Sequence, residues 1–204
     1  MANKSIHAKR VAPSGLDFVP VPGGPDNLTF GVSRRQIGVG PIQTVGQSIL
    51  RRLCPGTTVA ITEAWQPSCY RWDVLLPPDA PEVCRDPKRL CDLYEEQACP
   101  GLKDLAVMAT LRFPYPGPLH HVWEQVRAFA YERLCIERHL AVVAAMHLPV
   151  LVGSTNPPHV HLMMPARELC SFGFCEFVRP LATDQGKQIL ADELAQWMPA
   201  FLDA

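Results

Sequence analysis

The sequence lacks any long hydrophobic run. No stretch of about 18 or more apolar residues occurs in the 204-residue chain, which argues against a transmembrane helix. The chain starts with MANKSIHAKR, which is polar and basic, and no apolar segment of the signal-peptide type follows it. We therefore expect a protein that does not span a membrane and that stays in the cytoplasm.

The sequence also lacks a strong net charge and closely paired cysteines. The formal net charge is −1, so a nucleic-acid partner would require a local basic face. The eight cysteines include no CxxC pair, which argues against a zinc ribbon. Without a signal peptide, a disulfide framework is not expected either. We interpret the cysteines as small buried hydrophobic residues. Cys170 and Cys175 form the pair to examine for metal or redox chemistry.

What the sequence does contain is a mixed α and β pattern, with 48% hydrophobic and 19% charged residues. Residues 1–27 are rich in proline, glycine and polar groups, which indicates an extended or mobile N-terminal segment, so the domain covers 28–204. Strand patterns occur at 28–33, 70–77, 105–113, 140–147 and 159–164, with a shorter candidate at 59–64. Helical spacing occurs at 41–53, 86–99, 119–138 and 184–203.

Two histidines stand out in the stretch NPPHVHLMMPAR, which covers 156–167. On a strand, His159 and His161 point to the same face, and His147 ends the preceding strand pattern. Three imidazoles suit a first-row divalent metal and leave coordination positions open for a substrate oxygen. The alternative is that these are hydrogen-bonded core or edge histidines. Histidine-triad nucleotide hydrolases need HxHxH, and Met163 occupies the third position.

The same stretch resembles the NPHAH…TTR signature of MobA/MobL-type plasmid relaxases, which are HUH (His–hydrophobe–His) endonucleases. The order of segments from VLLPPDAP through LRFPYPGPLHHVWEQV to FGFCEFVRPL is similar as well. The likeness covers roughly 28–204 and is most pronounced over 70–204. It implies that His147, His159 and His161 hold a divalent metal ion (Mn, Mg or Zn). It also implies that the protein nicks and transfers single-stranded DNA in conjugative mobilisation of a plasmid.

The order of elements together with this resemblance predicts an α+β fold of the HUH relaxase type. We expect an antiparallel-dominated central sheet of about five strands, with helices packed on it. The 119–138 helix and its neighbours should cover one face, and the metal site should open on the other.

The sequence departs from the family at the nucleophile. Relaxases of this type place a tyrosine in the first long helix, and the matching run QSILRRLCPG has Leu53 there, followed by Cys54 as a chemically feasible substitute. The four tyrosines are elsewhere, at Tyr70, Tyr94, Tyr115 and Tyr131. The strand LAVMATLRF lacks the glutamate that family members often carry. These departures suggest either a degenerate relaxase or one with an unrecognised nucleophile.

A relaxase would bind single-stranded DNA through a basic face. We predict that the following arginines form it: Arg34, Arg35, Arg51, Arg52 and Arg167. The alternative for these residues is that they are ordinary solvated arginines. The alternative function is a non-catalytic relaxase-fold module that acts as a partner of other mobilisation or secretion proteins. A third reading is an unrelated metal-dependent hydrolase or nucleotidyl transferase.

Overall fold

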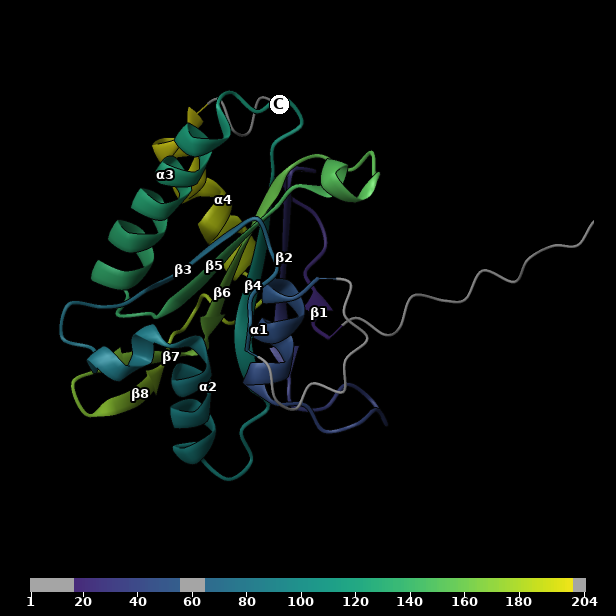
Figure 1. Cartoon of the computed structure of the whole chain (residues 1–204). Coiled ribbons are helices and arrows are strands. Elements are labelled where there is room, and N and C mark those ends of the chain that lie inside the picture. Colours follow the sequence, from purple (N-terminus) through teal and green to yellow (C-terminus); the bar gives the residue numbers. More distant parts are fainter. Residues whose placement is uncertain (1–16, 56–64, 200–204) are drawn as a thin grey trace, which may run out of the picture.

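The computed structural model describes residues 17–55 and 65–199, and its centre is a six-stranded antiparallel sheet (Figure 1). The strand order is β1-β2-β4-β6-β5-β3, and every neighbouring pair is antiparallel. The strands of this sheet are β1 (Val19–Pro20), β2 (Leu28–Arg34), β3 (Arg71–Leu75), β4 (Asp104–Arg112), β5 (Val142–His147) and β6 (His159–Pro165). The predicted fold class is therefore confirmed, with six strands where about five were expected.

The remaining elements cover the sheet or extend from it. The helices are α1 (Val45–Leu53), η1 (Glu82–Arg85), α2 (Pro87–Glu96), α3 (Leu119–Phe129), the π-helical η2 (Ala130–Ile136), η3 (Pro149–Val152) and α4 (Gly186–Trp197). A separate hairpin consists of β7 (Arg167–Cys170) and β8 (Gly173–Phe177). The helix predicted over 119–138 is thus α3 continued by η2. The candidate strand at 59–64 lies outside the described residues.

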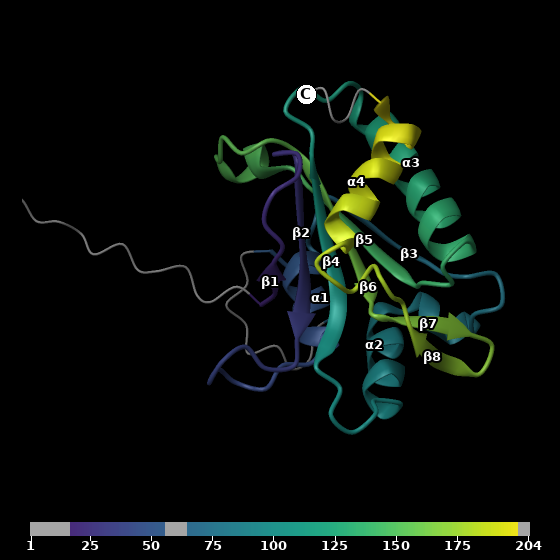
Figure 2. The ribbon, with the colours of Figure 1, turned by 180° about the vertical axis from the view of Figure 1, so that it is seen from behind.

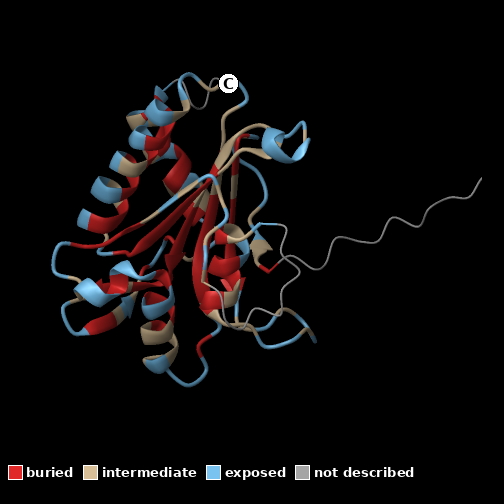
Figure 3. Ribbon diagram, viewed as in Figure 1, coloured by how far each residue is buried: buried red, intermediate tan, exposed pale blue. Residues whose placement is uncertain are grey.

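Two hydrophobic cores lie on opposite faces of the sheet (Figures 1 and 2). On one face, α3, η2 and α4 pack on alternate strand residues such as Ala144 and Leu162. On the other face, α1, α2 and the β7–β8 hairpin pack on the intervening residues, such as Ala145 and Met163. The red interior in Figure 3 runs through both layers. We expected helices mainly on the first face, and the structure shows that α1 and α2 cover much of the second.

The helix α1 is fixed at both ends by polar contacts. At its start, Thr44 and Gln47 form a capping box, in which each side chain bonds the other residue's backbone N–H. The Glu95 carboxylate from α2 accepts a further bond from the Val45 N–H, which stabilises the positive end of the helix. The basic Arg51 and Arg52 lie in the last turn, where the helix dipole favours cations.

Part of the predicted N-terminal segment belongs to the folded domain. Val19 and Pro20 pair with β2, and the Val21 N–H donates to the Phe30 carbonyl. Asp17 is buried and ion-paired to Arg52 on α1. Residues 1–16 lie outside the described residues, so the expectation of an extended segment applies to them as a prediction. No helix in the described ranges is both long and apolar enough to cross a bilayer.

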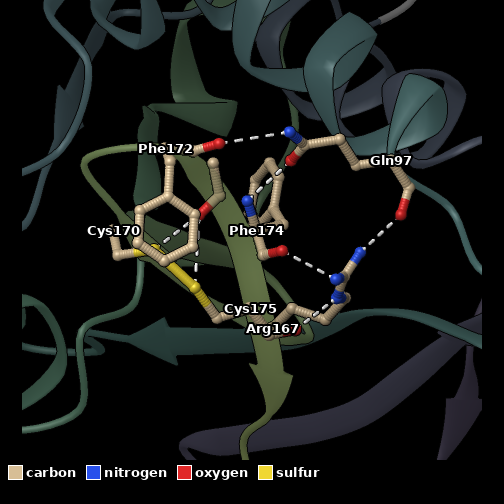
Figure 4. The surroundings of a disulfide bond; sticks show 7 residues. Gln97, Arg167, Cys170, Phe172, Phe174 and Cys175 are labelled. Carbon is tan, nitrogen blue, oxygen red and sulfur yellow. Dashed lines mark hydrogen bonds between the residues drawn. A yellow bond between two sulfur atoms is a disulfide. The ribbon is translucent and has the colours of Figure 1, made fainter.

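The β7–β8 hairpin is attached to α2 by a buried arginine (Figure 4). The Arg167 guanidinium donates to the backbone carbonyls of Cys175, Phe174 and Gln97, at 2.7, 2.7 and 2.8 Å. Cys170 and Cys175 are joined by a disulfide across the same hairpin, so this pair is not a metal site in this state. The remaining cysteines partly follow the prediction, since Cys84, Cys91 and Cys135 are buried and Cys99 is exposed.

We predict that Arg167→Ala lowers the free energy of unfolding by about 3–5 kcal/mol. The substitution removes the guanidinium donor from one buried and two partly buried carbonyls, and each such loss costs about 1–3 kcal/mol when the group stays out of water. Arg85→Ala is the matched control, because Arg85 is exposed and forms only a surface ion pair with Glu82. Urea denaturation measures both effects. Equal destabilisation by the two substitutions would contradict the structural role of Arg167.

Candidate metal centre

Three histidines meet at one end of the central sheet. His147 is the last residue of β5, and His159 and His161 are the first and third residues of β6. His147 lies directly opposite His159 in the register, and His161 lies opposite Ala145. Residues two apart on a strand share a face, and so do residues directly opposite each other on paired strands. All three imidazoles therefore project from the sheet face that α1 and α2 cover. The cluster therefore lies on the sheet face opposite α3, as predicted.

The three rings form a nearly regular triangle. Their centroids are 4.6 Å apart for His147 and His161, 4.9 Å for His159 and His161, and 5.1 Å for His147 and His159. Nitrogen atoms from the three rings all lie within 4.8 Å of one another. Tetrahedral ligands at about 2.0–2.1 Å from zinc are roughly 3.4 Å apart, so small ring movements suffice to bring them to bonding distance. The arrangement can hold one divalent ion and leave positions open.

Each ring has one nitrogen in a hydrogen bond, which leaves the other nitrogen for a ligand. His147 Nε2 lies 2.6 Å from the Arg52 carbonyl, and His159 Nδ1 lies 3.0 Å from the Pro157 carbonyl. A carbonyl only accepts, so these two nitrogens carry the proton and the opposite nitrogens have a free lone pair. His161 Nδ1 lies 2.8 Å from the Thr110 hydroxyl, which leaves Nε2 for a ligand when Nδ1 donates. Such partners orient metal-binding histidines in general.

The environment keeps the rings neutral. Burial is the main cause that lowers the pKa of His147 and His159, and the carbonyls of Arg52 and Pro157 oppose it in part. The pKa of His161 is well below its ordinary value because of burial and then because of the two neighbouring histidines. Neutral imidazole is the form that binds a metal, so these directions favour metal binding at neutral pH.

The surroundings of the cluster are positive. Within the described parts of the chain, no acidic side chain or cysteine joins the three histidines. Arg52 and Arg112 both act electrostatically on the cluster, since each contributes to the lowered pKa of His161. A divalent ion bound by three neutral ligands keeps its full charge. Together with the two guanidinium groups, it would make this end of the sheet an attractive place for an anion.

Three of the five predicted DNA-binding arginines lie far from the cluster. Arg34 pairs in register with Asp104 at the start of β4, whereas Arg112, at its end, is opposite His159. Eight residues along a strand span roughly 27 Å. Arg35 follows Arg34 and binds Glu95, and Arg167 is buried in the hairpin contact. The structure therefore does not bring these three arginines together with the histidines, and their predicted contact with DNA stays a prediction.

The other two predicted arginines lie in the last turn of α1, whose Arg52 carbonyl contacts His147, and both are engaged by a carboxylate. Arg52 Nη2 donates to Asp17 Oδ1 at 2.8 Å, and Nη1 bonds both Asp17 Oδ2 and the Ser48 carbonyl. Arg51 is more exposed and lies 3.6 Å from the same carboxylate. The Arg52 guanidinium also lies over the Phe18 ring, at 5.7 Å from its centroid. The N-terminal part of the domain thus holds the end of α1, whose Arg52 carbonyl contacts His147.

The structure places no nucleophile at the position that relaxases use. Leu53 is fully buried in the core between α1 and the sheet. The Cys54 thiol donates to the Gln66 carbonyl at 3.2 Å, an acceptor that does not activate it as a base would. Among the tyrosines, Tyr94 is buried, and Tyr115 is 87% exposed just beyond the end of β4. Tyr70 is about half exposed and its N–H donates to the Met146 carbonyl, next to His147.

Sequence reasoning missed three residues at this end of the sheet. Thr110 and Arg112 lie opposite His161 and His159 across β4 and β6. Trp72 lies opposite Ala145 on the same face and is 41% exposed. A signal for the first two was present, because they are polar residues at alternating positions in an otherwise apolar strand. Recognising their role required the strand order β4-β6-β5, which the sequence pattern alone does not supply.

Comparisons with known proteins agree with the fold. No protein-family model and no curated protein matches the sequence. A solved structure concerned with the molecular basis of vancomycin resistance transfer in Staphylococcus aureus is similar to this chain, with a TM-score of 0.51 and 20% sequence identity. The alignment covers 66% of this chain and 69% of that one. Similarity at this level shows a shared fold, and the α+β class with an antiparallel central sheet is the one that the sequence predicted.

Proposed function

We propose that this protein is a relaxase-like metal protein that binds single-stranded DNA during transfer of a mobile element. The single observation that carries the proposal is the triangle of three neutral histidines on a relaxase-like fold. His147, His159 and His161 would hold a divalent ion such as Mn, Mg or Zn. When bound, that ion supplies Lewis-acid polarisation of a phosphate oxygen.

The residues around the cluster support a phosphodiester as the substrate class. Arg52 and Arg112 supply positive charge on the side of α1 and β4, and Arg51 lies in the same last turn of α1 as Arg52. Exposed aromatic side chains at the same end, Trp72 and Tyr115, offer surfaces on which unpaired bases can stack. A positively charged surface with stacking side chains is what single-stranded nucleic acid requires, and the overall charge of −1 is compatible with such a local site.

The second candidate is a non-catalytic module with the same fold, which binds DNA or protein partners of a mobilisation or secretion complex. Buried Leu53 favours it, since no hydroxyl emerges from the end of α1. Incubating supercoiled plasmid and single-stranded oligonucleotides with the protein in Mn²⁺ or Mg²⁺ separates the two candidates. Metal-dependent nicks that disappear in His161→Ala support the enzyme, and metal binding without nicks supports the module.

The first prediction for this site concerns metal binding. His161→Ala should lower the affinity for Mn²⁺ or Zn²⁺ by about 100-fold or more, because it removes one of three ligands, and loss of mere supporting contacts already costs about 10–100-fold. His120→Ala is the control, since His120 is exposed at the start of α3, on the opposite face. Titration calorimetry and elemental analysis measure the effect. Equal metal content in both variants would exclude this metal site.

The second prediction concerns pH. A protonated imidazole does not bind a metal, and the three histidines have lowered pKa values, so they stay neutral to lower pH than usual. We expect the affinity for Mn²⁺ to fall less between pH 7.5 and 6.5 than it would with three ordinary histidines, and to fall more steeply at lower pH, where the lowered pKa values are crossed. Three histidines with ordinary values would give roughly a sixfold loss over the same interval. Calorimetry at three pH values distinguishes the two outcomes.

The third prediction concerns DNA. Arg51→Ala should weaken binding of a labelled single-stranded oligonucleotide several-fold, with a loss that shrinks as salt is raised. Arg34→Ala is a closely matched control: Arg34 is 47% and Arg51 45% exposed, and their carboxylate partners are 3.4 and 3.6 Å away. Arg34 lies at the far end of the sheet, so its loss should have little effect. Fluorescence anisotropy at two salt concentrations measures both, and identical behaviour of the variants would argue against DNA binding beside the cluster.

A further inference from the structure

Arg112 ends β4 directly beside the histidine cluster. It lies opposite His159 in the register of β4 and β6, so both side chains leave the same face of the sheet. Its Nη1 donates to the Thr29 hydroxyl on β2 at 2.5 Å. Thr29 in turn lies opposite Thr110, whose hydroxyl contacts His161. The guanidinium is therefore anchored in the same layer of side chains that orients the histidines.

Arg112 differs from the arginines predicted to bind DNA on β2 and α1 in having no counter-charge. Arg34, Arg35, Arg51 and Arg52 each face a carboxylate. Within the ranges that the structure describes, Arg112 forms no ion pair, and its side chain bonds only a neutral hydroxyl. The residue is partly buried, and a guanidinium has five N–H donors, most of which remain for another partner. A partly desolvated cation of this kind is stabilised when an anion is supplied.

We propose that Arg112 is the phosphate-binding arm of this site. Its planar fork binds an oxygen pair of a backbone phosphate in the single-stranded DNA, next to the face that His147, His159 and His161 present. Since the proposal names the contact by which the cluster region recognises DNA, it rests on the proposed function. Its basis is the register, the Thr29 anchor and the missing carboxylate.

The alternative role for Arg112 is structural, as a tie between β4 and β2. A structural residue would affect folding and the placement of His159, and hence metal binding. A phosphate-binding residue affects the affinity for DNA and its dependence on salt, and leaves metal binding intact. Removing a positive charge beside the cluster would even favour a cation slightly. These opposite expectations make the two roles separable.

The experiment compares four full-length proteins: wild type, Arg112→Gln, Arg112→Lys and Arg133→Gln. Arg133 is the control, because it lies on η2 on the opposite face and the same charge is removed there. Each protein is titrated into a labelled single-stranded oligonucleotide at several salt concentrations, in EDTA and in Mn²⁺. Calorimetry with Mn²⁺ alone measures metal binding, and thermal unfolding checks that each variant is folded.

We expect Arg112→Gln to weaken DNA binding about tenfold at low salt and to reduce the slope of log affinity against log salt by about 0.7, the value for one phosphate contact on a single strand. Arg112→Lys should keep the slope, because it retains the charge, and lose part of the affinity with the fork. Mn²⁺ binding should be at least as tight as in wild type. If Arg112→Gln does not fold, Arg112→Lys still tests the proposal through its loss of affinity for DNA with unchanged Mn²⁺ binding.

The proposal is overturned if Arg112→Gln binds DNA as Arg133→Gln does, if it loses Mn²⁺ binding as well, or if wild type binds no oligonucleotide at low salt. A different result is that wild type binds no Mn²⁺ but Arg112→Gln still weakens DNA binding in EDTA. That result would refute the proposed metal function and would support Arg112 as a phosphate-binding residue.

Discussion

The antiparallel register of β4, β6 and β5 is the constraint on which the rest of this site depends. It places His147 opposite His159, His161 opposite Thr110, and Arg112 opposite His159 on one sheet face. Because side chains alternate, a slip by one residue in β6 would turn both of its histidines into the α3–α4 core. The apolar residues Val160 and Leu162 prevent that slip, since they are fully buried on that opposite face. The packing of one face thus fixes the chemistry of the other.

The end of α1 adds a second constraint, from a distant part of the chain. The Arg52 carbonyl orients His147, and Asp17 holds the Arg52 side chain, so the folded N-terminal part of the domain bears on the cluster through a short series of contacts. The capping box at Thr44 and the Glu95 bond fix the other end of the same helix. A helix held at both ends keeps the Arg52 carbonyl in a fixed position. This matters because that carbonyl accepts from one nitrogen of His147 and so leaves the other nitrogen free.

The fold class was predictable from the order of elements together with the resemblance to relaxases, and the histidine cluster was predictable from a local pattern. Alternation and the HxH spacing assign the face of His159 and His161, and the adjacent strand supplies His147. The roles of the arginines were not predictable in this way. Arg34 and Arg51 look alike in the sequence, and only the folded structure shows that Arg34 lies at the far end of β4 whereas Arg51 lies in the turn of α1 that contacts His147. Arg167 looked like a surface cation and is buried by the β7–β8 hairpin, a unit that short patterns did not indicate.

A relaxase both binds a metal ion with a DNA phosphate and cleaves the strand, and in this molecule the two properties depend on different residues. Binding of a cation and a phosphate would depend on side chains of β4, β5 and β6. Every described side chain needed for it projects from the same face of the sheet. Scission of a strand needs a nucleophile as well, and α1 offers Leu53, whose side chain fills the core. A tyrosine there would have to bury its hydroxyl among apolar side chains, at a cost in stability, or displace the helix end, which would disturb the Arg52–His147 contact. The same end of α1 thus packs Leu53 into the core and orients His147 through the next carbonyl.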